Sequence, residues 1–153
     1  MPTRSTVKKA KRDLRAGKSP TTAAGEFVRE EIEHVRHRKH GARSTKQAIA
    51  IGLSKARRSG VELKPPAQGE ASEKTRKGAR RDYARGHGAP ARRRSTAKRA
   101  NASERALKRE PRSAASSRAL SRQAHQSARR RGPAQRSAAA RKAARTRQSR
   151  ARA

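Results

Sequence analysis

The chain has 153 residues, of which 44 are Lys or Arg and 11 are Asp or Glu, so its formal net charge is +33. Low hydrophobicity combined with high net charge excludes one hydrophobic core spanning the whole chain. The lack of cysteine excludes disulfides and thiolate–metal sites and fits a reducing compartment. Neither secretion nor membrane spanning is expected, because the first residues form no apolar signal segment and no long apolar run occurs.

Large apolar side chains are concentrated in the first part of the chain. Counting Val, Ile, Leu, Phe and Tyr gives eleven up to Lys64, whereas the remaining 89 residues contain only Tyr83, Leu107 and Leu120. This distribution predicts a mostly α-helical protein with a small three-helix module over residues 1–66. Residues 67–153 are expected to form a basic, low-complexity and largely disordered tail with transient helices.

Two helices are predicted before residue 40. The first covers about residues 6–16, where apolar side chains share one face and Gly17 ends the helix. The second covers about residues 20–39, with Ser19 as its cap and Pro20 at its first position. Its apolar residues recur at three- and four-residue steps: Phe27, Val28, Ile32 and Val35.

The stretch "STKQAIAIGLSKARRSG" (residues 44–60) predicts a third helix over residues 45–58. Ser44 and Gln47 have the spacing of a capping box, and Gly60 ends the helix. The alternation in "AIAIGL" is also compatible with a strand, but the cap, the length and the basic end favour a helix. Small residues at four-residue steps predict close approach of another helix. The expected packing residues on both helices are Phe27, Val28, Ile32, Val35, Ala48, Ile49, Gly52, Leu53 and Ala56.

The small residues Ala48, Gly52 and Ala56 form a ridge along the third helix. The element that packs against this ridge is either the second helix or another copy of the chain. Ile51 points away from the ridge, which leaves room for a protein partner or for self-association through residues 20–60. A protein-interaction module is therefore the alternative hypothesis, with the tail tethering the complex to RNA, a ribosome or DNA.

The tail begins after Pro65 and Pro66, which block helix continuation. Residues 111–153 contain no acidic residue, and residues 65–153 carry a net charge of +22, from 27 basic and 5 acidic residues. Such a segment repels itself and attracts polyanions, with helices expected where phosphates neutralise the arginines. The predicted nucleic-acid contacts are Arg92, Arg93, Arg94, Lys98, Arg99, Arg129, Arg130, Arg131, Arg141, Lys142 and Arg145.

A helix-turn-helix made from the second and third helices is a further alternative, with Lys46 and Gln47 at the groove. The connection "KHGARS" is longer than the turn of that motif, so an ordinary helical hairpin is favoured.

Three histidines near the end of the second helix, His34, His37 and His40, resemble metal ligands at first sight. Glu31-x-x-His34 has the spacing found in di-iron bundles, but no second copy occurs. His34 and His37 lie off the apolar arc, so solvated histidines are expected, with no metal and no cofactor. Glu31 falls inside the arc and needs a basic partner, for which Arg12, Arg15 and Lys55 are the candidates. No catalytic pattern is found, so no enzyme is expected.

Residues of about 7–66 resemble a family of small basic bacterial proteins classed as a domain of unknown function. The likeness is carried by "SPTTAAGEFV", "HGARSTKQAIAIGLSKARR" and the closing prolines. Some family members are named plasmid stabilisation or DNA-binding protein, and the tail is similar in composition to linker-histone-like bacterial tails. The resemblance implies a bacterial, nucleoid-associated setting but no established activity.

These patterns together predict a non-enzymatic protein that binds nucleic acid without sequence preference. Double-stranded DNA is the expected partner, with RNA as an alternative, because phosphate contacts do not distinguish the two. The expected role is nucleoid association or DNA shielding, in the cytoplasm.

Overall fold

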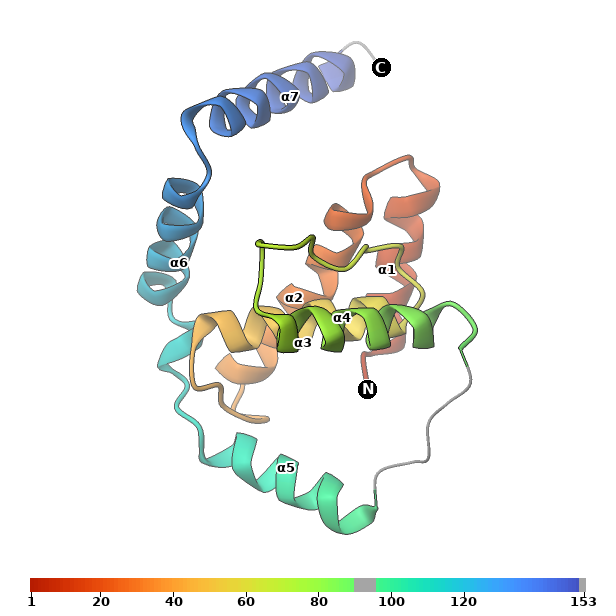
Figure 1. The fold of residues 1–153 in the computed structure, drawn as a ribbon, viewed down its shortest axis with the longest axis vertical. Coiled ribbons are helices and arrows are strands. Elements are labelled where there is room, and N and C mark those ends of the chain that lie inside the picture. The colour runs from red at the N-terminus through yellow and green to blue at the C-terminus, as the bar shows by residue number, and fades with distance from the viewer. Residues whose placement is uncertain (90–95, 152–153) are drawn as a thin grey trace. The chain divides into compact units, whose positions relative to one another are not determined.

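The structure is a computed structural model that describes residues 1–89 and 96–151. Within these ranges it is mostly helical and has no strand, which confirms the predicted helical class (Figure 1). The elements are α1 (Arg4–Arg15), α2 (Pro20–Arg36), α3 (Thr45–Arg58), α4 (Glu73–Gly86), α5 (Ala97–Arg109), the short 3₁₀ helix η1 (Ser113–Ala115), α6 (Ser117–Arg130) and α7 (Pro133–Ala151).

The chain divides into two compact units, Met1–Ser116 and Ser117–Ala153. The first unit is larger than the expected 1–66 module, because α4 packs on α3 and η1 packs on α2 and α3. In the second unit, α6 and α7 take the place of the largely disordered tail that composition suggested. Ala and Arg dominate these segments and are strong helix formers, which explains the helices.

The first three helices each begin at a side-chain cap. Oxygens of Thr3, Ser19 and Ser44 accept the backbone N–H of the residue three positions later. In a capping box Gln47 would accept the N–H of Ser44, but here its Oε1 accepts the N–H of Arg43 at 2.7 Å. Gln47 therefore holds the residue before the cap and fixes how the chain enters α3.

Phe27 lies at the centre of the core and is fully buried. The buried residues clustered with it are Ala10, Ala23, Ala24, Ala56 and Val61, and Val7, Leu14, Leu53 and Leu63 cover them partly. Alanines on facing helices let α1 approach α2, and α2 approach α3, around one aromatic ring. A small, alanine-rich core of this kind suits a chain with so few large apolar residues.

The closest approach between α2 and α3 occurs at Gly52. A Cβ atom placed on Gly52 would lie 2.7 Å from Cα of Val28 and 3.0 Å from the carbonyl oxygen of Phe27. Real Cβ atoms do not come so near to backbone, so only glycine fits at this crossing. Ala48 and Ala56, one turn away on either side, are also fully buried.

Residues 107–115 return to the connection between α2 and α3. Gly41 donates its N–H to the carbonyl of Leu107 at 2.8 Å, and Ala42 donates to Pro111 at 3.1 Å. The Thr45 hydroxyl donates to the carbonyl of Ala114 at 2.6 Å inside this contact. These bonds hold the end of α5 and η1 against the helical hairpin.

Candidate functional site

Of the predicted nucleic-acid contacts, those that the structure describes are all exposed. Lys98 and Arg99 lie on α5 in the first unit; the second unit carries Arg129 and Arg130 in the last turn of α6, Arg131 after it, and Arg141, Lys142 and Arg145 on α7. The structure thus distributes them over two units. Arg92, Arg93 and Arg94 lie outside the described residues.

Helix α7 carries positive charge around its whole circumference. Its basic residues fall at positions that cover every side of the helix, with no acidic residue between them: Arg136, Arg141, Lys142, Arg145 and Arg147. Every side chain described on α7, up to residue 149, is exposed. A helix without an apolar face has nothing to bury against a core, but it can meet phosphates on any side.

Three helices of the first unit carry stripes of exposed basic residues, most of which are not among the predicted contacts. On α1, basic residues at intervals of four, three and four share one exposed face: Arg4, Lys8, Lys11 and Arg15. Comparable exposed stripes are Lys74, Lys77, Arg81 and Arg85 on α4, and Lys98, Arg105 and Arg109 on α5. The helical spacing of these stripes is visible in the sequence, but of their residues only Lys98 is among the predicted contacts.

Aromatic side chains are not free to stack on bases. The chain has one Phe, one Tyr and no Trp. Phe27 is fully buried, and the Tyr83 ring stacks on the ring of His87 with centroids 4.0 Å apart. Single-strand binding that relies on aromatic platforms is therefore not favoured.

The helix-turn-helix alternative does not agree with the start of α3. Thr45 is buried under η1, and Gln47 is engaged with the Arg43 backbone, so only Lys46 projects freely there. A recognition helix needs several residues of its first turns in the groove.

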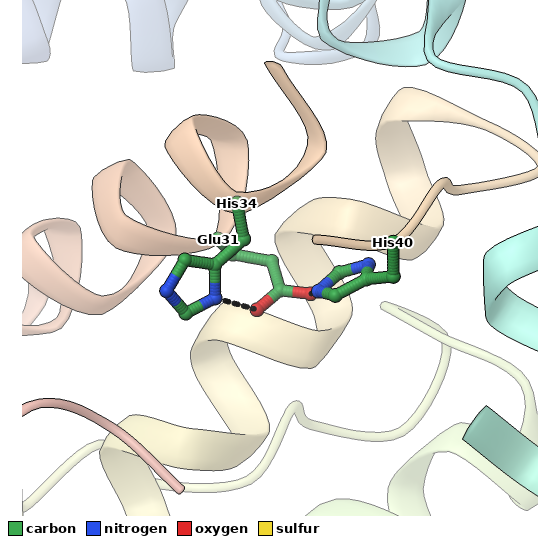
Figure 2. A group of neighbouring side chains, drawn as sticks. All are labelled: Glu31, His34 and His40. Carbon is green, nitrogen blue, oxygen red and sulfur yellow. Dashed lines mark ion pairs between the residues drawn. The ribbon is translucent and has the colours of Figure 1, made fainter. Parts of the chain in front are cut away.

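A buried polar cluster forms where α2, α3 and their connection meet. The Glu31 carboxylate is fully buried, and Lys55 donates to its Oε2 at 2.6 Å. Of the three partners that the sequence allowed, the structure selects Lys55. Figure 2 shows the carboxylate between the rings of His34 and His40.

Two of the three histidines are not solvated as expected. The side chains of His34 and His40 are 14% and 16% exposed, whereas that of His37 is 73% exposed. His34 turns inward because α2 is covered on this side by residues from other elements, which a helical projection of α2 alone does not reveal. Burial, together with the charges of Lys55 and Lys39, lowers the pKa of His34 below its usual value.

The histidines contact both buried carboxylates. His40 Nε2 lies 3.2 Å from Glu31 Oε1, and His34 Nδ1 lies 4.0 Å from Glu31 Oε2. His34 Nε2 lies 3.6 Å from Oε1 of Glu30, and that oxygen accepts the Thr3 N–H at 2.8 Å. One donor atom each from Glu31, His34 and His40 lie within 4.8 Å of one another, so these residues have the chemistry to hold a metal ion.

The surface of the hairpin leaves little room for a hydrophobic partner. Among the residues that the structure describes, Met1 is the only large apolar residue that is exposed. Ile49, Ile51 and Leu53 are half-buried. Self-association through residues 20–60 stays a prediction, with these half-buried side chains as its apolar contribution.

No helix in the described parts of the chain has the length and apolar character needed to cross a bilayer. Comparisons with protein-family models, with curated proteins and with solved structures found no match to this chain. The function is therefore inferred from the residues and their arrangement.

Proposed function

We propose that this protein is a non-enzymatic nucleic-acid-binding protein that holds duplex DNA through phosphate contacts, without sequence preference. The observation that carries the proposal is α7, a helix with cations on every side and every described side chain in solvent. Each Lys or Arg that meets a phosphate releases condensed counterions, which supplies affinity independent of base sequence. The basic stripes on α1, α4 and α5 extend the same chemistry to the first unit.

The proposed location in the cell, the nucleoid, rests on the same phosphate-binding chemistry. A protein of net charge +33 associates with whichever polyanion surrounds it, and a nucleoid role is the simplest consequence. The resemblance to basic bacterial proteins with DNA-related names points the same way. RNA is the competing partner, and parallel titrations with duplex RNA decide between the two.

Neutralising three neighbouring arginines tests the proposal. The variant Arg129→Gln/Arg130→Gln/Arg131→Gln should weaken binding equally for two duplexes of unrelated sequence. Its slope of log affinity against log salt should be shallower by about 3, since each phosphate contact contributes about 0.9. Fluorescence anisotropy at several salt concentrations measures both quantities.

The matched control removes one positive and one negative charge together, so the net charge of the protein does not change. Glu104 and Lys108 form an exposed ion pair of 2.8 Å on α5. The variant Glu104→Gln/Lys108→Gln keeps the net charge and should leave affinity and slope unchanged. Equal losses in both variants, or a loss confined to one DNA sequence, would count against binding by phosphate contacts alone.

A further inference from the structure

The environment of the Glu31 carboxylate is incomplete. Its Oε2 is held by the Lys55 ammonium at 2.6 Å, but its Oε1 is buried and accepts no hydrogen bond. Buried carboxylate oxygens without a partner are costly and call for an explanation such as a bound ion. His40 Nε2 lies 3.2 Å from this oxygen.

The orientation of His40 makes this contact informative. Its Nδ1 lies 3.0 Å from the carbonyl oxygen of Gly41, and a carbonyl only accepts, so Nδ1 carries the hydrogen. In the neutral ring, Nε2 then carries a lone pair and donates no hydrogen bond to Glu31 Oε1, 3.2 Å away. A lone pair beside a carboxylate oxygen is unfavourable unless a cation binds both.

The separation of these two atoms agrees with two ligands of one metal ion. A charge-assisted hydrogen bond between these groups would measure about 2.7–2.9 Å and be well aligned. Two ligands bound at about 2.0 Å in a tetrahedron lie about 3.3 Å apart, close to the observed 3.2 Å. His34 adds a second imidazole from the same side of α2, with its ring 6.0 Å from that of His40 and nearly perpendicular to it.

The surroundings match those of a metal-binding histidine pair. One nitrogen of His40 is fixed by a backbone carbonyl, and His34 Nε2 faces the Glu30 carboxylate, which the Thr3 N–H holds. Such contacts orient histidine ligands and select the nitrogen that meets the metal. Both histidine side chains are partly exposed, at 14% and 16%, so the cluster is not sealed from solvent.

We infer that Glu31, His34 and His40 bind a divalent transition-metal ion of the zinc type, with water completing the coordination. Two imidazoles and one carboxylate form a donor set that Zn²⁺ accepts readily. The ion would link α2 to the connection that follows it. That connection also holds residues 107–111 through Gly41 and Ala42, so the ion would stiffen the contact that closes the first unit.

The full-length protein, freed of nucleic acid by nuclease and high salt, tests the inference by titration with Zn²⁺ alone. One ion per chain is expected, and His34→Gln and His40→Gln should each weaken binding by at least about 10-fold. His37→Gln is the matched control on the exposed side of the same helix end and should have no effect. Binding that is absent, or that depends on His37 and not on His34 and His40, would overturn the inference.

A second measurement keeps the test valid if a variant does not fold. Zn²⁺ added to the unaltered protein should shift the imidazole NMR signals of His34 and His40, and leave those of His37, His87 and His125 in place. Co²⁺ should give the intense visible absorption of a four-coordinate site. Uniform shifts of all five histidines, or none, would contradict a site at Glu31. Neither the titration nor the spectra depend on DNA binding. Failure of the metal site and failure of the proposed DNA binding can therefore be distinguished.

Discussion

Lys55→Met is expected to lower the free energy of unfolding of the first unit by about 3–5 kcal/mol. Lys55 reaches Glu31 Oε2 at 2.6 Å, and the carboxylate is fully buried. Methionine keeps most of the side-chain volume but removes the cation, so a buried negative charge loses its partner. Since small domains are stable by only about 5–15 kcal/mol, urea unfolding followed by circular dichroism should detect the loss easily.

Two comparisons show whether the loss comes from the buried charge. Lys46→Met, on the exposed first turn of the same helix, should change stability by no more than about 0.5 kcal/mol. Replacing both partners, as Glu31→Leu/Lys55→Met, should recover much of the stability, because no unpaired charge remains. If the double variant were as unstable as Lys55→Met, the ion pair would not be the cause.

Gly52→Leu is expected to destabilise the same unit by about 3 kcal/mol or more, through a clash with backbone. Even the first added carbon would lie 2.7 Å from Cα of Val28, and a helix backbone cannot move aside as a side chain can. The two helices must separate, which opens the core around Phe27. Thermal unfolding should show a lower midpoint for the variant.

The same substitution at Gly25 provides the control. Gly25 lies within α2, and nothing comes within 4 Å of a Cβ placed there. Gly25→Leu should leave stability unchanged or raise it by up to about 1 kcal/mol, since leucine is the better helix former. DNA affinity should stay the same in Gly25→Leu and fall only in part in Gly52→Leu, because the most basic helix, α7, belongs to the other unit. Complete loss of affinity together with folding in Gly52→Leu would mean that the two units do not act separately.

Local sequence signals predict most of the hairpin formed by α2 and α3. The caps Ser19 and Ser44 and the recurrence of apolar residues place the two helices. A glycine between alanines at four-residue steps indicates that another backbone approaches there. Each of these signals depends on residues within one helix, where spacing along the chain translates directly into position.

The return of residues 107–115 could not be predicted in this way. The hydrogen bonds that hold it end on its backbone carbonyls, as from Gly41 to Leu107 and from Thr45 to Ala114, and such acceptors leave no side-chain pattern. The histidines were predicted to be solvated for a related reason. His40 lies beyond the end of α2, so its position relative to Glu31 depends on the path of the connection. A helical projection of α2 assigns His34 to the polar face, but it contains no information on which other elements cover that face.

The salt dependence of duplex DNA affinity tests the central claim most directly. About ten phosphate contacts predict a slope near −9 when log association constant is plotted against log salt concentration, equal for unrelated sequences. Anisotropy titrations of the full chain between low and physiological salt measure it. An affinity that stays flat over this range, or a slope that differs between sequences, would contradict binding through a polycationic surface.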